Sequence, residues 1–338
     1  MSDAPVLSVR DLEVEFDTYG GVVRAVRGVS YDVHEGETLA VVGESGCGKS
    51  VTVQALMGLI PMPPGRIVNG SAKLLGKELI GLDQAQLNRA RGADMGMIFQ
   101  DPMTSLNPTM RIGDQIAETL IVHRGLSRDQ GFQEAIRLLE RTRIPEAAQR
   151  VRQYPFEFSG GMLQRVMIAM SLACTPKLLI ADEPTTALDV TIQDQVLDLM
   201  KEIQQEDRMA IVLITHDLGV VARMADRVAV MYAGEVVEYG SVDEIFYHSS
   251  HPYTQGLKLA MPGAHQQHSE RLRAIPGSPP DLFSPPKGCA YHPRCPQAMK
   301  ICNRHDPAST RISESHQAAC WLLHEGAPGR SEDDVHAG

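Results

Sequence analysis

Long hydrophobic runs are missing from this sequence. No window approaches the roughly 18 consecutive apolar residues that a membrane helix requires. Residues 1–9 also lack the basic segment followed by an apolar stretch that marks a signal peptide. We therefore expect the chain to stay in the cytosol, and we do not expect it to form a channel by itself.

Positive charge is also scarce. The chain has 32 Lys and Arg residues against 42 Asp and Glu residues, which gives a formal net charge of −10. A surface of this sign repels a phosphate backbone unless a local basic patch reverses the field. Nucleic acid is therefore not an expected partner.

The remaining composition is that of a globular protein, with 43% hydrophobic and 22% charged residues. At 338 residues the chain exceeds the size at which one hydrophobic core usually stops growing. We expect a large domain over residues 1–250 and a smaller C-terminal region over residues 251–324. Residues 325–338 are rich in Gly, Asp, Ser and Glu and are expected to be a disordered tail.

Short apolar runs alternate with helical patterns in the large domain. The expected strands are 37–43, 95–99, 178–181 and 210–215, and the expected helices are 50–60 and 192–206. This alternation favours an α/β fold with a mainly parallel sheet covered on both faces. Residues 101–173 have helical spacing and predict a helical insertion. Residues 227–240 contain two β-rich runs around Ala233 and Gly234 and predict a hairpin or paired strands.

Residues 43–50 match the pattern G-x-x-x-x-G-K-[ST] at every fixed position, between an expected strand and an expected helix. Glycines let such a loop curl so that its N–H groups converge on phosphate oxygens, helped by the positive end of the next helix. Lys49 would lie at the β- and γ-phosphates, and the Ser50 hydroxyl would ligate Mg²⁺. The expected nucleotide-binding residues here are Gly43, Glu44, Ser45, Gly46, Cys47, Gly48, Lys49, Ser50 and Val51. The loop alone does not separate ATPases from GTPases or small-molecule kinases.

Two carboxylates end the expected strand at 178–181. Asp182 is placed to hold Mg²⁺, directly or through water, and Glu183 to polarise the water that attacks the γ-phosphate. An acidic pair at a strand end is only moderately specific, because a solvated pair in a loop is the alternative. Its meaning depends on the motifs around it.

Residues 158–165, with the sequence FSGGMLQR, precede this strand and present Ser159, Gly160 and Gly161 at a helix start, which is a second anion site. Here the chain resembles the ABC ATPase family, although Phe158 and Met162 replace the commoner Leu and Gln. The resemblance implies a P-loop NTPase (RecA-like) core of ABC type, with an antiparallel β subdomain, a helical insertion and a small Cys-rich C-terminal extension. It also implies that two subunits sandwich two ATP molecules.

Weaker matches follow in the family's order across residues 43–216. They are Gln100 after the strand at 95–99, the run Ala187, Leu188 and Asp189, and His216 after the strand at 210–215. The resemblance implies that Gln100 senses Mg²⁺ or the attacking water, that Asp189 communicates across the dimer and that His216 contacts the γ-phosphate. An aromatic residue of the first strand would stack on adenine; Phe16 is the expected residue and Tyr19 the alternative.

Residues 99–108 and 251–254, followed by the run PGSPP at 276–280, resemble the dipeptide and oligopeptide importers within that family. The resemblance implies a homologous second ATPase, two permease subunits and an external binding protein. It places the chain at the cytoplasmic face of a bacterial inner membrane as a peripheral subunit. Relatives that import nickel or glutathione share much of this pattern, and a soluble ABC ATPase is a more distant alternative.

Four of the six cysteines lie near the C-terminal end, at Cys289, Cys295, Cys302 and Cys320, with spacings x₅, x₆ and x₁₇. Disulfides are disfavoured in a reducing cytosol, and the C-x₂-C pairs typical of structural zinc are absent from the sequence. Four thiolates can hold a 4Fe-4S cluster, and importer ATPases that resemble this chain carry one at these positions. Such a cluster would have a structural role; zinc and no metal remain alternatives.

Overall fold

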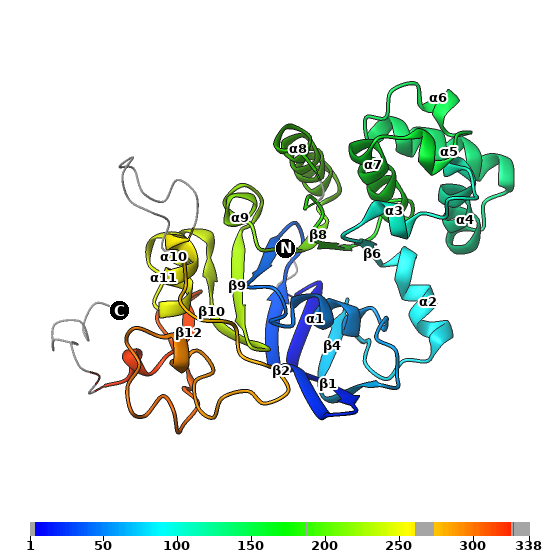
Figure 1. Ribbon diagram of the computed structural model, residues 1–338. Coiled ribbons are helices and arrows are strands. Elements are labelled where there is room, and N and C mark those ends of the chain that lie inside the picture. Colours follow the sequence, from blue (N-terminus) through cyan, green and yellow to red (C-terminus); the bar gives the residue numbers. More distant parts are fainter. Residues whose placement is uncertain (1–3, 187, 261–273, 326, 328–338) are drawn as a thin grey trace. The chain divides into compact units, whose positions relative to one another are not determined.

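The computed structural model describes residues 4–186, 188–260, 274–325 and 327 (Figure 1). By its contacts the chain divides into two compact units, which are described separately. The first comprises Met1–Leu7, Asp32–Thr38 and Lys73–Ile214, and the second comprises Ser8–Tyr31, Leu39–Ala72 and Thr215–Gly338. The domain boundaries expected at residues 250 and 324 stay predictions, and most of the expected tail, residues 326 and 328–338, lies outside the described residues.

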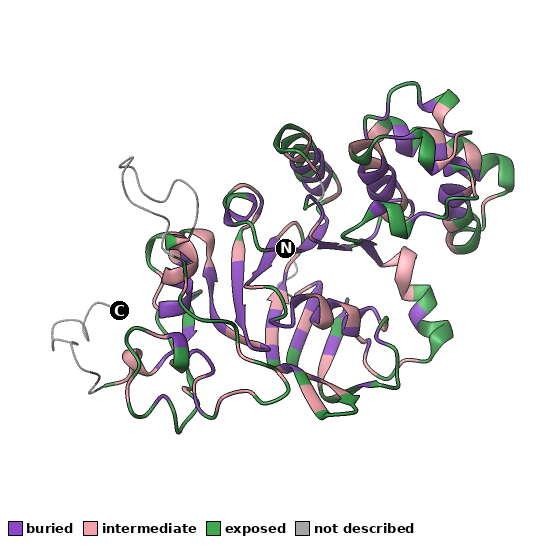
Figure 2. Cartoon of the chain, in the orientation of Figure 1, coloured by how far each residue is buried: buried purple, intermediate pink, exposed green. Residues whose placement is uncertain are grey.

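The first unit is organised around three parallel strands, which lie where the apolar runs predict them. They are β6 (Met95–Ile98), β7 (Leu178–Asp182) and β8 (Ala210–Thr215). In register, Ile98 pairs with Ala181, and Ala181 pairs with Leu213. Every residue of these strands is buried (Figure 2), as expected for parallel strands covered on both faces.

Helices supply the rest of the first unit. They are α2 (Gln84–Ala93), α3 (Pro102–Ser105), α4 (Ile112–Arg124), α5 (Arg128–Arg141), α6 (Ala147–Arg150), α7 (Gly160–Ser171) and α8 (Val190–Asp207), with a 3₁₀ turn at Pro155–Glu157 and the two-residue strand β5 (Lys77–Glu78). A core of its own joins α4, α5 and α7 through buried Ile116, Leu139 and Val166. The described residues between 101 and 173 contain no strand, as the sequence predicts.

The second unit contains parallel and antiparallel strands. The loop-forming strand β3 (Thr38–Val42) pairs in parallel with β9 (Arg227–Tyr232), and β10 (Glu235–Ser241) returns antiparallel to β9 through Ala233 and Gly234. Both turn residues have positive φ, 50° and 85°, which confirms the predicted hairpin. A separate sheet contains β2 (Gly21–Val33), β1 (Leu7–Thr18) and β4 (Gly65–Leu74) in that order. Parallel and antiparallel sheets together confirm the α/β class.

Short helices and strands complete the second unit. They are α1 (Lys49–Leu56), α9 (Leu218–Met224), α10 (Val242–Tyr247), α11 (Pro252–Leu259), β11 (Ser309–Arg311), β12 (Gln317–Ala319) and 3₁₀ turns at His292–Arg294 and Trp321–Leu323. The predicted helix 50–60 ends early, at Leu56, because Gly58 follows with φ 58° and Pro61 cannot continue it. None of the helices among the described residues is long and apolar enough to cross a membrane.

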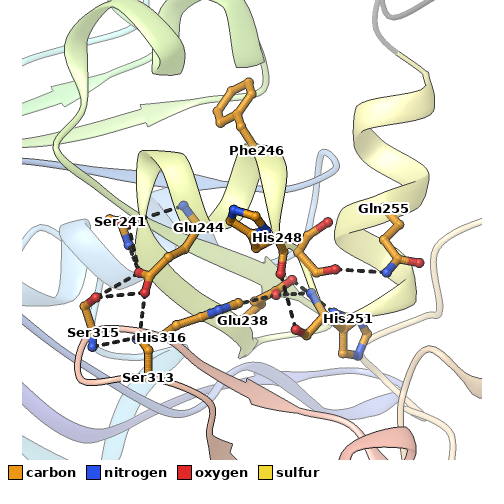
Figure 3. Close-up of polar contacts among 12 residues, drawn as sticks. Glu238, Ser241, Glu244, Phe246, His248, His251, Gln255, Ser313, Ser315 and His316 are labelled. Atoms are coloured by element: carbon orange, nitrogen blue, oxygen red, sulfur yellow. Dashed lines mark hydrogen bonds and ion pairs between the residues drawn. The ribbon is translucent and has the colours of Figure 1, made fainter. Parts of the chain in front are cut away.

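Two glutamates hold the C-terminal strands to the rest of the second unit (Figure 3). Glu238, fully buried on β10, accepts hydrogen bonds from the backbone N–H groups of Ser250 (2.5 Å) and His251 (3.2 Å) and faces Nε2 of His316 at 2.8 Å. Glu244 of α10 accepts a hydrogen bond from the Ser313 hydroxyl at 2.5 Å. The region after residue 251 is therefore docked by specific polar contacts as well as by the pairing of β12 with β10.

Candidate nucleotide-binding site

The loop at residues 43–50 leaves β3 at Val42 and enters α1 at Lys49. Gly43 and Gly48 are required in this loop because a side chain at either position would collide with the backbone of a neighbouring strand. A Cβ on Gly43 would stand 2.2 Å from the carbonyl oxygen of Met231, and one on Gly48 would stand 2.3 Å from that of Ala25. Gly48 also has φ 102°, a backbone conformation that side chains strain. The loop is thus pressed against β2 and the end of β9.

Lys49 is buried, and its ammonium group is fixed on the loop itself. Nζ donates to the carbonyl oxygens of Gly43 at 2.8 Å and Glu44 at 3.0 Å. The carbonyl of Cys47 accepts from the N–H of Gly234 at 2.9 Å, which ties the loop to the β9–β10 turn. Burial raises the pKa of the Cys47 thiol, in keeping with a small packing residue. Ser50 and Val51 follow as the second and third residues of α1.

His216 lies beside this loop in the second unit. It directly follows β8, is exposed, and lines a cavity of about 610 Å³ together with Gly43, Glu44 and residues of α9 and α11. The next residue, Asp217, caps α9 by accepting from the N–H of Gly219 at 2.7 Å. The predicted γ-phosphate contact is therefore positioned by a strand end and a helix cap.

The candidate catalytic pair lies in the first unit. Because β6 and β7 pair in parallel and in register, their carboxyl ends meet at one edge, and there Nε2 of Gln100 donates to Oε2 of Glu183 at 3.0 Å. The Thr186 hydroxyl donates to the same oxygen at 3.0 Å. Glu183 has φ 47°, a strained conformation that the N–H bond to the Ile214 carbonyl helps to hold.

The expected Mg²⁺ ligands are divided between the units. Asp182, buried at the last position of β7, and the exposed Gln100 belong to the first unit, and Ser50 belongs to the second.

The segment at Ser159 to Gly161 begins α7. Oγ of Ser159 accepts from the N–H of Met162 at 3.4 Å, the N-cap arrangement that the sequence predicts. A Cβ on Gly161 would stand 2.5 Å from Cγ2 of Ile192, so this glycine is needed for packing against α8. At Gly160, by contrast, a Cβ would meet no atom within 4 Å in the described chain. A side chain at Gly160, the first residue of α7, would therefore have open space, whereas one at Gly161 would not.

Three further predicted residues have clear positions. Asp189 caps α8 by accepting from the N–H of Ile192 at 3.0 Å, and Ala187 lies outside the described residues. Phe16, on β1, is half-buried and packs near Gly65 of β4. Tyr19 lies in the β1–β2 turn with its side chain fully exposed. The adenine-stacking role stays a prediction for both aromatic residues.

Two residues of the C-terminal region contact the phosphate-binding loop, and the sequence did not identify them. The N–H of Glu44 donates to the Tyr253 hydroxyl at 2.9 Å. The Glu44 carboxylate receives two hydrogen bonds from Arg294, at 2.5 and 2.9 Å. The available signal was the run His251-Pro252-Tyr253, which marked the importer resemblance but had no assigned contact.

The four C-terminal cysteines lie close enough to influence one another. Burial and then its cysteine neighbours raise the pKa of Cys289 to about 12, and burial and then Cys295 and Cys302 raise that of Cys320 to about 11. Within the described ranges, however, no group of three or more His, Cys, Asp or Glu side chains is arranged to hold a metal ion. The donor atoms suit an iron-sulfur cluster, but their arrangement is not that of an assembled ligand set, so the predicted cluster is not supported by the geometry.

Comparison with protein families gives two matches. Residues 26–186 match the ABC transporter family, and residues 237–302 match the C-terminal region of oligopeptide/dipeptide transporters.

Curated relatives match over nearly the whole chain. The oligopeptide transport ATP-binding protein OppD of Bacillus subtilis is 56% identical over 323 residues, covering 96% of this chain and 90% of the relative. The dipeptide transport ATP-binding protein DppD of the same organism is 53% identical over 322 residues, covering 95% of this chain and 96% of the relative.

Solved structures of ABC cassettes match the fold of most of the chain. The dimeric post-hydrolysis structure of the ATP-binding cassette MJ0796 bound to ADP and Pi has a TM-score of 0.63 at 26% identity, covering 70% of this chain and 98% of that chain. The cbiO1 protein from Clostridium perfringens, part of the ABC transporter complex cbiONQ, has a TM-score of 0.61 at 28% identity, covering 72% of this chain and 91% of that chain.

Proposed function

The chain belongs to the family of ATP-binding proteins of oligopeptide and dipeptide ABC transporters, and on this basis we propose that it hydrolyses ATP to drive peptide uptake through a membrane permease. The observation that carries the proposal is the combination, in one chain, of the phosphate-binding loop and the Gln100–Glu183 pair with a C-terminal region of the oligopeptide/dipeptide type.

Glu183 is the proposed general base. Its Oε2 is held by Gln100 and Thr186, so the carboxylate is oriented before substrate arrives and needs little reorganisation. Gln100 is well placed to report on the attacking water because it contacts the base directly. Mg²⁺, when bound with ATP, neutralises phosphate charge; Ser50 and Asp182 are its proposed ligands, with Gln100 as a further one.

Hydrolysis is proposed to require a second ATPase subunit. Gly160 is exposed at the first position of α7, so this helix N-terminus suits the γ-phosphate of an ATP that a partner subunit holds. Asp189, exposed at the start of α8, is the proposed contact between the two subunits. ATP binding would then favour a closed dimer, and hydrolysis would release it, as a population shift driven by differential affinity.

The remaining proposals concern the partner proteins, the location and the metal content of the chain. We propose a homologous ATPase partner, two permease subunits and an external binding protein, with this chain attached to the cytoplasmic face of the inner membrane. The four cysteines are proposed to ligate a structural 4Fe-4S cluster, which would require their side chains to reorient. Iron and acid-labile sulfide in anaerobically purified protein would support the cluster, whereas bound zinc or no metal would contradict it.

The proposed function is tested by purifying the chain with its membrane partners and measuring ATPase activity in lipid. Co-purified permeases and turnover stimulated by dipeptides or oligopeptides would support it. Stimulation by nickel or glutathione alone would contradict the peptide assignment and leave the ATPase intact. Purification without any membrane protein would contradict the transport role.

A further inference from the structure

Glu44, the second residue of the phosphate-binding loop, is held by two side chains of the C-terminal region. Its N–H donates to the hydroxyl of Tyr253 at 2.9 Å, and its carboxylate is bound by both terminal nitrogens of Arg294, at 2.5 and 2.9 Å. The three residues all belong to the second unit, although Arg294 lies 250 positions away in sequence. Nucleotide phosphates would bind next to this point.

Arg294 is fixed as well as paired. Its side chain is only 5% exposed, against 25% for Glu44. Its remaining hydrogen bonds go to the carbonyl oxygens of Pro276 (2.9 Å) and Gly277 (3.4 Å) and to the hydroxyl of Tyr232 (3.3 Å). With the two bonds to Glu44, these contacts engage all five N–H groups of the guanidinium. A buried, bidentate pair of this kind is strong and orients both partners, unlike a pair on the surface.

A single residue, Glu44, connects Arg294 to Lys49. The carbonyl oxygen of Glu44 accepts from Nζ of Lys49 at 3.0 Å. Glu44 is therefore held through its N–H by Tyr253, through its carboxylate by Arg294 and through its carbonyl by the lysine expected to bind phosphate. Displacing the Glu44 carboxylate would disturb the peptide group on which Lys49 rests.

Aromatic packing supports the same connection. The rings of Tyr232 and Tyr253 have centroids 4.5 Å apart, and Tyr291 lies 5.2 Å from the first and 5.3 Å from the second. Tyr232 ends β9, beside the loop, and Tyr291 immediately precedes the 3₁₀ turn that carries Arg294. A continuous packed core thus joins the C-terminal region to the loop.

We propose that Arg294 is a positioning residue for ATP binding: by fixing and neutralising Glu44, it keeps the phosphate-binding loop ready for nucleotide. The proposal rests on the proposed ATP binding at residues 43–50 and assigns a role to the C-terminal region in it. Two physical reasons support it. A loop held in place before binding loses less freedom when ATP arrives. An unpaired Glu44 carboxylate beside a triphosphate would repel it, and Arg294 cancels that charge.

The test measures the dissociation constant of ATP in the presence of Mg²⁺ by calorimetry on the full-length chain. Arg294→Gln should raise the constant on the order of tenfold, within the range of typical couplings between sites. Arg294→Lys keeps the charge but loses the two-pronged contact, so its constant should be intermediate. Lys287→Gln removes the same charge from an exposed position of the same region and should leave the constant unchanged.

A double-variant comparison separates positioning from a purely structural role. If Arg294 acts through Glu44, then in a Glu44→Gln background the Arg294→Gln change should alter the constant by no more than about twofold, the error of ordinary additivity. An equal loss in both backgrounds would overturn the proposal, because Arg294 would then act only by folding its own region. A wild-type-like constant for Arg294→Gln would overturn it as well.

Three further outcomes have distinct meanings. If Arg294→Gln does not fold, Arg294→Lys takes its place. Weaker ATP binding by Arg294→Lys in the wild-type background, but not in the Glu44→Gln background, would support the proposal. Binding like that of the wild type would overturn it. If the wild-type chain itself binds no ATP, this inference and the proposed function fail together. If the wild type binds ATP and the Arg294 variants bind it equally well, this inference fails and the proposed function stands.

Discussion

Replacing Glu183 by Gln should stop ATP turnover without disturbing the site. Gln100 and Thr186 both donate to the same carboxylate oxygen, Oε2, each at 3.0 Å. A glutamine can place its carbonyl oxygen there and keep both hydrogen bonds. Its amide nitrogen then replaces Oε1, and an amide does not accept a proton from water. The bond from the Glu183 N–H to the carbonyl of Ile214 involves only backbone and is retained.

The expected loss follows from the role of a general base. Such a group contributes typically about 10²- to 10⁴-fold to the rate. At about 1.4 kcal/mol per tenfold, this is roughly 3 to 5 kcal/mol of transition-state stabilisation. ATP binding should change little, because Glu183→Gln keeps the hydrogen bonds from Gln100 and Thr186. A fall in kcat at nearly constant ATP affinity is therefore the expected pattern.

The assay is phosphate release by the transporter complex in lipid at saturating ATP and Mg²⁺, with ATP binding measured in parallel. Thr186→Ala is the control, because it removes one hydrogen bond to Oε2 and leaves the carboxylate in place. It should cost less in turnover than Glu183→Gln, at most on the order of a hundredfold, the value of one hydrogen bond to a charged group. Turnover by Glu183→Gln within tenfold of wild type would refute the role of Glu183 as base. An equal loss of ATP affinity would instead place it in binding.

Most of the parallel core could be predicted because its strands are uniformly apolar. The runs at 178–181 and 210–215 correspond to β7 and β8, whose residues are all buried. The first strand is harder to read. In β1 the alternation of buried and exposed residues fails at Arg10 and Asp11, both exposed, and Asp11 has φ 46°. A strand with such an interruption loses the period of two on which sequence reasoning depends.

The candidate site, like the fold, could be predicted from the sequence only in part. Motifs at strand ends identified Gln100 and Glu183 as candidate site residues, and the structure adds that the parallel, in-register strands bring the two side chains into contact. The contacts of Glu44 with Tyr253 and Arg294 could not be predicted, since they join positions 209 and 250 residues apart and follow no periodic pattern. The cysteine spacing predicted a metal cluster that the described side-chain arrangement does not support.

Further predictions concern two neighbouring glycines and a buried histidine. Gly161→Ala should lower stability by about 1–3 kcal/mol in urea unfolding, because its Cβ would overlap Ile192, whereas Gly160→Ala should leave stability intact and lower only ATP turnover. Equal stability losses would contradict this difference. Burial lowers the pKa of His251 to about 4 from 6.5. Between these values the unfolded chain binds the extra proton, so stability falls as pH falls from 6.5 to 4, by up to roughly 3 kcal/mol. His251→Asn can still cap the N–H of Tyr253 but does not titrate. Its unfolding free energy should therefore decline less over this pH range, and parallel curves for variant and wild type would show that the buried imidazole is not the source.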